Sequence, residues 1–389
     1  MPPSGSDRPP GGVYLHAPFC SVRCTYCDFP TVAGRDDKMG AYVEALAREV
    51  ATAPCPGLTR VDSIFFGGGT PSRLAGSQVA RLLAAVRERF EVADDTEITL
   101  EGNPESLAPA ALAAFRDAGV TRISVGVQSL DDAVLKRVGR AHDAAEARRA
   151  VASARAAGFS DVSIDLIAGL PGENLSRWGE TIAEAASWSS QHVSVYLLES
   201  DKDTPLARAA RGGRLTLHDD DALALAYEAT VEALDRAGFS LYEISNFARD
   251  GRRSRHNLKY WTDVPYAGFG LGAASYLDGA RRTNRRDLDG YLADLEAGRS
   301  PVAERDPYDP GRRLEEALFL GLRVVEGVDL SALSRRYGVD ARRRFAAAWE
   351  RAREAGSIVE SADRVALTAS GRLRSNDLFA DLLGEGPSL

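Results

Sequence analysis

Cysteine is scarce in this chain of 389 residues, and its distribution does not suit a disulfide framework. There are only four cysteines, and Cys20, Cys24 and Cys27 lie close together in one short segment. Proteins that depend on disulfides carry more cysteines, spread along the chain, and fold in oxidising compartments. We therefore expect a cytoplasmic protein in which the three clustered thiols serve chemistry. Cys55, in the segment TAPCPG, is expected to be an ordinary thiol.

Long apolar runs are also absent from the sequence. A helix that crosses a bilayer needs about 20 consecutive apolar residues, and no stretch approaches that length. The first residues, MPPSGSDRPPGG, lack the basic and then apolar pattern of a signal peptide, so residues 1–12 are expected to be a disordered lead-in. A net charge of −8 argues against a nucleic-acid partner. These observations predict a globular protein with no membrane span.

Six β-like runs alternate with amphipathic helical runs between Val13 and residue 245. The β-like runs are rich in Val, Ile and aromatic residues, as buried parallel strands are. The strand candidates cover residues 13–18, 63–67, 97–102, 122–128, 161–168 and 192–199, and the helix candidates cover 39–51, 77–90, 109–118, 144–157 and 176–188. This alternation predicts a parallel sheet with right-handed crossovers, and six units make a partial (βα)6 barrel over residues 13–245. Periodicity alone leaves an open doubly wound sheet as the alternative.

The pattern changes in the last part of the chain. Residues 246–310 are expected to connect the barrel to a compact C-terminal domain over 311–389. That domain is predicted from helical runs at 314–325, 330–337 and 341–355, a hairpin at 357–368 and a last helix at 371–383. Helices followed by a small hairpin indicate a winged-helix-like α+β module. Acidic residues stand among its arginines, so DNA binding is not expected, and the fold itself does not carry a function.

The chemistry of the sequence is concentrated in HAPFCSVRCTYCDFP (16–30). Iron–sulfur clusters take thiolate ligands. A C-x3-C-x2-C spacing places three thiols on one tight loop, enough to hold three irons of a cubane and leave the fourth open. A zinc site with His16 as its fourth ligand is an alternative, although structural zinc usually takes two separated ligand pairs. Three incidental thiols are the remaining alternative.

Polar residues recur at the ends of the later strand candidates. Gly67-Gly68-Gly69-Thr70 follows the second strand, and Glu101, Gln128 and Asp165 lie at or near the ends of the next three. The carboxyl ends of parallel strands in a barrel face a common mouth, so these side chains are expected to converge there. Glycines at such a position let the backbone approach a ligand closely. Each residue could also be an ordinary strand-end polar group or a helix cap.

These motifs together resemble those of a known family. CSVRCTYC resembles the radical S-adenosylmethionine (SAM) signature, and FFGGGTPS, EGNPES, SVGVQS and IDLIAGLPGE follow in the family's order. The pattern is similar to the oxygen-independent coproporphyrinogen III oxidase family and, within it, to the HemW branch of heme chaperones. The resemblance implies that Cys20, Cys24 and Cys27 hold a [4Fe–4S] cluster whose open iron takes SAM. It also implies SAM contacts from Tyr14, Tyr26, Gly68, Gly69, Thr70, Glu101, Gln128, Arg140 and Asp165.

Three features favour the chaperone branch over the oxidases. The oxidases that the sequence resembles carry a fourth cysteine two residues after the third, where this chain has Phe29, and a long arm before the first strand. HNLKYW (256–261) resembles the H-N-x-x-Y-W motif of the HemW branch, whose histidine is implicated in heme binding. His256 would then be a heme ligand, and nearby arginines could pair with the heme propionates: Arg249, Arg252, Arg253 and Arg255. Without the resemblance, His256 is better explained as a loop histidine bonded to backbone.

Two functions from different classes therefore remain. The first is a heme chaperone that binds heme and transfers it to an acceptor protein, with the cluster and SAM serving that transfer. The alternative is a radical SAM enzyme that decarboxylates coproporphyrinogen III in porphyrin biosynthesis. The cofactor carries the difficult chemistry in either case, and the barrel positions it. The identity of the acceptor, the fate of SAM and the oligomeric state, including a homodimer, are left open by the sequence.

Overall fold

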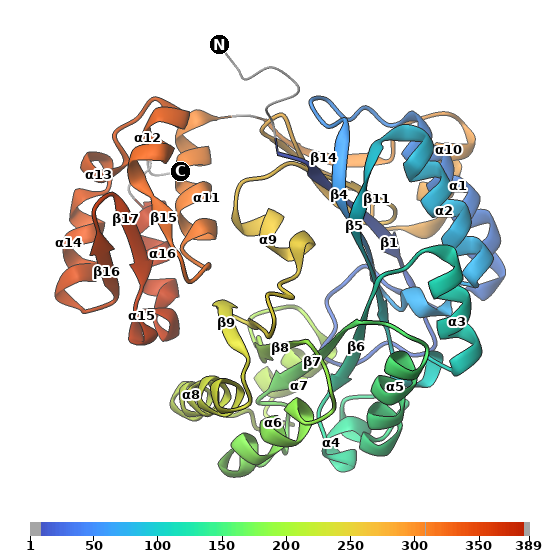
Figure 1. Cartoon of the computed structure of the whole chain (residues 1–389), viewed down its shortest axis with the longest axis horizontal. Coiled ribbons are helices and arrows are strands. Elements are labelled where there is room, and N and C mark those ends of the chain that lie inside the picture. Colours follow the sequence, from blue (N-terminus) through green and yellow to red (C-terminus); the bar gives the residue numbers. More distant parts are fainter. Residues whose placement is uncertain (1–8, 308, 385–389) are drawn as a thin grey trace.

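The structure is a computed structural model that describes residues 9–307 and 309–384. Its main body is a curved sheet in which seven neighbouring strands of the described chain are parallel (Figure 1). These strands are β11 (Tyr266–Phe269), β1 (Gly11–Ala17), β4 (Arg60–Gly68), β5 (Glu91–Gly102), β6 (Arg122–Gln128), β7 (Asp161–Ala168) and β8 (His192–Leu197), in that spatial order. All six predicted strands are present.

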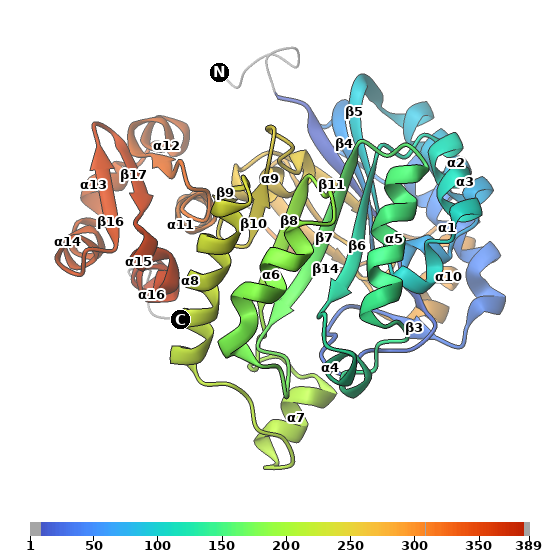
Figure 2. The same cartoon turned by 60° about the horizontal axis from the view of Figure 1, so that its bottom comes forward.

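Helices cover the convex face of this sheet (Figure 2). They are α1 (Met39–Thr52), α2 (Gly76–Arg89), α3 (Pro109–Ala118), α5 (Ala144–Ala156), α6 (Trp178–Ala186) and α8 (Asp220–Arg236). Two short helices, α4 (Asp132–Arg137) and α7 (Pro205–Arg211), lie instead at the carboxyl ends of the strands (Figure 2). From β1 to β8 the spatial order of the strands follows the chain order, without the reversal that defines a doubly wound sheet. The partial (βα)6 barrel is therefore confirmed, and its sheet stays open in the described chain.

Residues 246–310 contribute to the sheet as well as connecting two domains. At one edge β10 (Asn246–Ala248) pairs antiparallel with β8 and with β9 (Ser240–Glu243), the strand that precedes this segment. At the other edge β11 is followed by β12 (Ala274–Leu277), β13 (Ala280–Asn284) and β14 (Val302–Asp306), with α10 (Leu288–Glu296) between the last two. Several of these strands are short and arginine-rich, so they lack the alternation that reveals a strand in a sequence.

The segment HNLKYW forms a helix, α9 (Arg255–Trp261), where the sequence suggested a loop. This helix lies on the concave side of the sheet, between it and the C-terminal domain (Figure 1). Ser254 caps it, because its hydroxyl accepts a hydrogen bond from the Asn257 backbone N–H at 3.3 Å. The concave face is thus filled by a helix that belongs to the region between the two domains.

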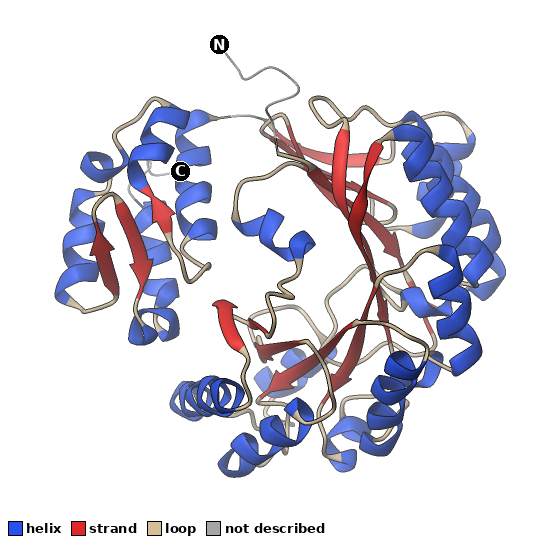
Figure 3. Cartoon of the chain, in the orientation of Figure 1, coloured by secondary structure: helices blue, strands red, loops and turns tan. Residues whose placement is uncertain are grey.

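The C-terminal domain has its own core, as expected for a winged-helix-like module. Its three-stranded antiparallel sheet has the order β15 (Val328–Asp329), β17 (Arg364–Leu367), β16 (Ile358–Ser361), and helices surround it (Figure 3). The helices are α11 (Pro310–Gly321), α12 (Leu330–Tyr337), α13 (Ala341–Arg344), α14 (Ala346–Glu354), α15 (Ala369–Leu373) and α16 (Ser375–Gly384). Leu318, Phe345 and Trp349 are among its buried residues. Residues 1–8 of the expected lead-in and 385–389 of this domain lie outside the described residues, and β1 begins at Gly11.

A short backbone pairing joins the C-terminal domain to the edge of the main sheet. The Ile244 N–H donates to the Arg323 carbonyl at 3.0 Å, and the Val325 N–H donates to the Tyr242 carbonyl at 3.1 Å. Arg253 of the main body also forms an ion pair with Glu326 of the C-terminal domain, at 2.6 Å. Among the described residues, no helix has the length and apolar character that crossing a membrane requires.

A buried carboxylate fastens the first helix to the far edge of the sheet. Glu49 on α1 accepts hydrogen bonds from the Gly270 N–H at 2.8 Å, the Asn284 amide at 2.6 Å and the Tyr291 hydroxyl at 2.6 Å. Burial raises the pKa of Glu49 to about 7, although these three hydrogen bonds act in the opposite direction. The neutral form of Glu49 is therefore favoured more in the folded chain than in the unfolded chain.

This pKa predicts a pH dependence of stability that a glutamine at position 49 would lack. The folded pKa is raised above the ordinary value of 4.5, so the stabilisation is present below pH 4.5 and is lost as the pH rises through about 7. We expect the free energy of unfolding of the parent to fall, relative to Glu49→Gln, by roughly 3 kcal/mol across that range. Urea denaturation of both proteins at several pH values measures this difference. A difference that stays constant from pH 5 to 8 would contradict it.

Candidate cluster and cofactor site

The three clustered cysteines lie on one loop at the carboxyl end of the parallel strands. The loop begins at β2 (Phe19–Cys20) and ends before β3 (Val32–Ala33), with which β2 pairs. Two backbone hydrogen bonds hold its middle: the Thr25 N–H donates to the Val138 carbonyl at 3.0 Å, and the Leu206 N–H donates to the Thr25 carbonyl at 2.9 Å. Tyr26 packs against a small apolar cluster formed by Val134, Val138, Leu170 and Leu206. Contacts with Val138 and Leu206 therefore hold the loop from two sides.

The cysteine sulfurs are partly exposed and accept hydrogen bonds from the barrel. The Thr70 hydroxyl donates to the Cys20 sulfur, and the Arg140 guanidinium donates to the Cys24 sulfur, both at 3.6 Å. Burial raises the pKa of the Cys20 thiol and raises that of Cys27 to about 11. Coordination to a metal would deprotonate these thiols. Their environment therefore suits a metal centre better than a free thiolate nucleophile.

The arrangement also bears on which metal centre the loop can hold. Across residues 9–307 and 309–384, no three His, Cys, Asp or Glu side chains converge as ligands of one ion. In a cubane each thiolate binds a different iron, so its ligands need not converge on one point. His16 does not complete a zinc site, because its Nε2 contacts the Pro30 carbonyl at 2.9 Å and its Nδ1 contacts the Tyr14 hydroxyl at 3.1 Å. The three cysteines fit a [4Fe–4S] cluster.

The glycine motif packs directly beneath this loop. Gly68 has a φ of +117°, and a Cβ on it would lie 2.5 Å from the His16 ring. A Cβ on Gly69 would lie 2.5 Å from the Pro18 carbonyl oxygen. The Gly68 N–H donates a hydrogen bond to the Glu101 carboxylate at 3.2 Å. Only glycine allows this close approach between the motif and the strand that leads into the cysteine loop.

Two half-buried carboxylates, Glu101 and Asp165, lie near enough for their charges to interact at the mouth of the barrel. Burial, followed by the charge of Asp165, raises the pKa of Glu101 to about 8. Burial also raises the pKa of Asp165, although the Ser124 hydroxyl donates to it at 2.8 Å and the Ser163 hydroxyl at 3.3 Å. Two nearby carboxylates that resist ionisation form a region that favours a cationic ligand. The expected nearness of Glu101 and Asp165 is thus met, because the charge of Asp165 acts on Glu101.

Arg140 connects the barrel to the cysteine loop. It lies in the turn after α4, and its guanidinium donates to the Gly126 carbonyl at 2.7 Å and to the Asn103 side-chain oxygen at 2.8 Å. Its Nε is buried and has no hydrogen-bond partner in the structure. Gln128, at the end of β6, has a φ of +68°, an uncommon value for a residue other than glycine. The two side chains lie close to each other over Gly126.

Sequence reasoning missed several residues that support this mouth. Asn103 donates to the Thr70 hydroxyl at 3.2 Å as well as accepting from Arg140, and it stands in the motif EGNPES. That motif was a signal that could have identified it. Ser124 and Ser163 hold Asp165, but a serine within a β-like run carries no distinctive signal.

His256 lies deep in the structure, away from the exposed cysteine loop. Its side chain is about 1% exposed, with Nδ1 contacting the Ser63 hydroxyl and Nε2 contacting the Tyr260 hydroxyl, both at 3.0 Å. The Phe65 ring stacks on it, with centroids 5.2 Å apart. Burial lowers the pKa of His256 to about 3, so the imidazole is neutral. In this arrangement neither ring nitrogen presents a free lone pair to a heme iron.

Three of the four expected propionate partners already have contacts within the protein. Arg253 pairs with Glu326 at 2.6 Å, and Arg255 pairs with Asp95 at 3.0 Å. The Arg249 guanidinium lies 3.8 Å from the centre of the Phe239 ring. In this structure the three arginines therefore make contacts within the protein, and Arg253 joins the main body to the C-terminal domain.

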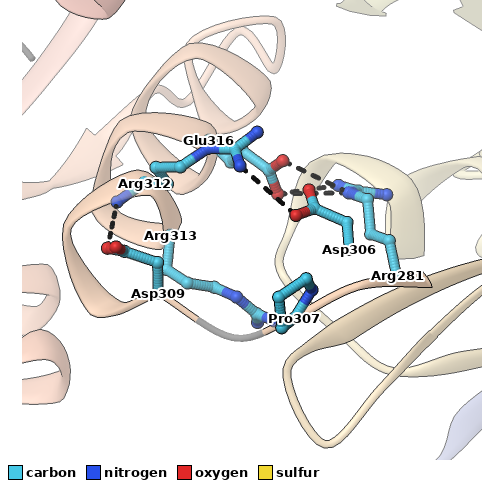
Figure 4. Close-up of a pocket in the computed structure, with 7 residues that line it drawn as sticks. All are labelled: Arg281, Asp306, Pro307, Asp309, Arg312, Arg313 and Glu316. Atoms are coloured by element: carbon cyan, nitrogen blue, oxygen red, sulfur yellow. Dashed lines mark hydrogen bonds and ion pairs between the residues drawn. The ribbon is translucent and has the colours of Figure 1, made fainter. Parts of the chain in front are cut away.

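A shallow pocket lies where β13 and β14 meet α11 (Figure 4). Three acidic and three basic side chains contribute to its lining, which comprises Arg281, Asp306, Pro307, Asp309, Arg312, Arg313 and Glu316. Arg281 pairs with Glu316 at 3.1 Å and Arg312 pairs with Asp306 at 3.3 Å. Because the charges offset one another, this pocket offers no net attraction for a dianionic ligand.

Comparison with known proteins places the chain in a family. Residues 14–185 match the Radical SAM superfamily, and residues 308–374 match the HemN C-terminal domain. The chain is 34% identical over 374 residues to the heme chaperone HemW of Bacillus subtilis, which covers 96% of this chain and 99% of that protein. It is 37% identical over 383 residues to the heme chaperone HemW of Mycobacterium tuberculosis, with 96% and 95% covered.

A solved structure shows the same fold. Coproporphyrinogen III oxidase (HemN) from Escherichia coli superposes with a TM-score of 0.82 at 23% identity, covering 96% of this chain and 90% of that one. Taken together, the fold and the cysteine loop define a radical SAM protein. Within that superfamily the chain belongs to the HemW family of heme chaperones.

We expect reconstituted protein to hold about four irons per chain, as one cubane cluster requires. Cys20→Ala, Cys24→Ala and Cys27→Ala should each abolish the cluster, because each removes one of three protein ligands. Cys55→Ala is the matched control and should retain it. Iron and sulfide analysis, with the visible absorption spectrum, measures the outcome. A Cys24→Ala protein with its cluster intact would show that Cys24 is not a ligand, and stoichiometric zinc in place of iron would show that the loop holds a different metal.

Proposed function

We propose that this protein is a cytoplasmic heme chaperone that carries a SAM-bound [4Fe–4S] cluster, binds heme and passes it to an acceptor protein. The observation that carries the proposal is the similarity to curated heme chaperones at 34–37% identity over 95–99% of their length. Phe29 gives further support, because it stands where the oxidases that the sequence resembles have a fourth cysteine. Its side chain is 58% exposed, so core packing does not require an aromatic residue there.

In this proposal Cys20, Cys24 and Cys27 would each bind one iron of the cluster, and the fourth iron would be left for SAM. The hydrogen bonds from Thr70 to Cys20 and from Arg140 to Cys24 would then stabilise thiolate charge and adjust the reduction potential of the cluster. When bound, the cluster and SAM together supply one-electron chemistry. The chain's own contribution is to orient the two groups and to shield them.

The same proposal gives the barrel mouth the task of holding SAM. Glu101 and Asp165 would face the ligand from the strand ends, and the sulfonium charge of SAM suits two carboxylates whose pKa values burial raises. The glycine motif at Gly68 and Gly69 provides backbone close to the ligand. Arg140 would act from the other side, and the remaining contacts come from Tyr14, Tyr26, Thr70 and Gln128.

This assignment predicts a pH-dependent affinity for SAM. The pKa of Glu101 is raised to about 8, so below that pH its carboxyl group must lose a proton before it can pair with a cation. Affinity should therefore rise between pH 6.5 and 8.5, by up to about tenfold per pH unit below the pKa. Glu101→Gln should weaken binding and flatten this dependence, and Asp165→Asn should weaken binding, with iron content unchanged in both.

SAM titrations of the reconstituted proteins, followed by the cluster's electron paramagnetic resonance, measure these effects. Glu180→Gln is a control, because Glu180 lies on the outer helix α6 and pairs with Arg177 at 2.7 Å. If both Glu101→Gln and Asp165→Asn bind SAM as tightly as the parent, the mouth does not hold SAM.

The heme ligand is a separate question, and His256 remains a prediction. For His256 to bind heme iron through Nε2, the Tyr260 hydroxyl must release that nitrogen. The ring is buried, so α9 must also move to make it accessible. If His256 is the axial ligand, heme binding competes with the His256–Tyr260 contact. Removing that contact should then favour heme binding, whereas removing the imidazole should oppose it.

Two variants test this assignment with opposite expected signs. His256→Ala should weaken heme binding and shift the Soret band, because loss of an axial imidazole changes the ligand field of the iron. Tyr260→Phe should strengthen binding by about two- to tenfold, the size of one net hydrogen bond. Heme titrations at about one heme per chain measure both. Parent-like titrations in both variants would show that another residue ligates the iron.

The same preparations distinguish the chaperone from the alternative enzyme. With SAM and reductant, the parent should not convert coproporphyrinogen III to protoporphyrinogen IX, and it should transfer bound heme to an apoprotein acceptor. Conversion of coproporphyrinogen III, together with unaltered heme titrations in His256→Ala, would favour the enzyme.

A further inference from the structure

A chain of buried hydrogen bonds runs from Asp165 to the first turn of α9. The Ser163 hydroxyl donates to Asp165 at 3.3 Å and lies 2.8 Å from Nδ1 of His192. Nε2 of His192 lies 2.8 Å from the Tyr242 hydroxyl, which accepts a hydrogen bond from the Ser254 N–H at 3.2 Å. The three linking side chains, those of Ser163, His192 and Tyr242, are each at most about 1% exposed. This series of hydrogen bonds therefore crosses the interior of the protein from β7, through β8 and β9, to the N-cap of α9.

The two ends of this chain fix the direction of every hydrogen bond in it. The Ser254 N–H can only donate, and an ionised Asp165 can only accept. The Tyr242 hydroxyl must then donate to Nε2 of His192, and Nδ1–H must donate to the Ser163 hydroxyl. Burial lowers the pKa of His192 well below its ordinary value, which agrees with a neutral ring carrying one proton. If the hydrogen bonds ran the other way, the Ser163 hydroxyl would donate to His192, and Asp165 would lose its hydrogen bond from Ser163. The Tyr242 hydroxyl proton would then have no acceptor among these residues.

We infer that His192 and Tyr242 are positioning residues that couple Asp165, in the barrel mouth, to α9, the helix that carries His256. Hydrogen bonds that all point the same way polarise one another, so each strengthens when its terminal acceptor carries a full charge. A cation held beside Asp165 keeps that carboxylate ionised, which strengthens the chain and tightens the Ser254 N-cap. The inference rests on the proposed role of Asp165 in binding SAM, and it adds a route by which SAM changes the order of α9.

Linkage makes the coupling reciprocal: if SAM orders α9, an ordered α9 must raise the affinity for SAM by the same factor. Breaking the chain at either end should therefore have the same two effects. Tyr242→Phe removes one hydroxyl from the α9 end, and Ser163→Ala removes one hydroxyl from the Asp165 end. Each should weaken SAM binding about three- to tenfold, the size expected when one net hydrogen bond is lost.

The test uses reconstituted protein with its cluster, SAM affinity by calorimetry, and amide hydrogen exchange of residues 254–261 with and without SAM. In the parent, SAM should slow amide exchange in this segment several-fold. In Tyr242→Phe and in Ser163→Ala that slowing should disappear. Tyr291→Phe is the matched control. It removes a buried tyrosine hydroxyl that donates to the Glu49 carboxylate, which takes no part in this series of hydrogen bonds. It should keep both the parent's SAM affinity and the slowing of exchange.

The outcomes separate this inference from the proposed function. If Asp165→Asn weakens SAM binding while Tyr242→Phe and Ser163→Ala match the parent, Asp165 binds SAM but the chain does not couple it to α9. The inference is also overturned if Ser163→Ala alone weakens binding, because the effect then stops short of His192. Parent-like affinity in Asp165→Asn would show that the proposed SAM site itself is wrong. Because exchange in α9 is measured without heme, the result does not depend on which residue ligates heme iron.

Discussion

Glu97 holds α9 inside the curved sheet, and much of the site is arranged around this attachment. Its carboxylate accepts hydrogen bonds from the backbone N–H groups of Arg255 at 3.0 Å and His256 at 3.2 Å, and from the Ser254 hydroxyl at 3.4 Å. The first N–H groups of a helix have no partner within the helix, and a carboxylate also complements the positive end of its dipole. An open sheet would otherwise expose its concave face. With α9 anchored there, the interior of the partial barrel becomes a protected space.

The sequence predicts those parts of the molecule that depend on local pattern. The six strands, the five helices α1, α2, α3, α5 and α6, and the C-terminal domain follow from apolar periodicity. The gathering of Glu101 and Asp165 follows from their shared position at strand ends. Strands β13 and β14 could not be predicted, because ARRTN and VAERD derive their strand character from pairing with distant neighbours.

The same reason explains the environment of His256. Its contacts with Ser63 and Phe65 on β4 join residues almost 200 positions apart in the sequence, which no local pattern encodes. The resemblance to a known motif identified His256 as notable, and the structure adds that it is enclosed. Similarly, the close match to the fold of HemN from Escherichia coli does not transfer an activity, because function depends on the site rather than the fold.

The pairing of Glu243 with Val324 has a consequence for the solubility of the protein. β9 is the last strand at its side of the main sheet, and a free strand edge is a template for joining another chain. The C-terminal domain occupies part of that edge through the backbone bonds at Tyr242 and Ile244. The domain thus shields part of this strand edge from pairing with the edge of another sheet.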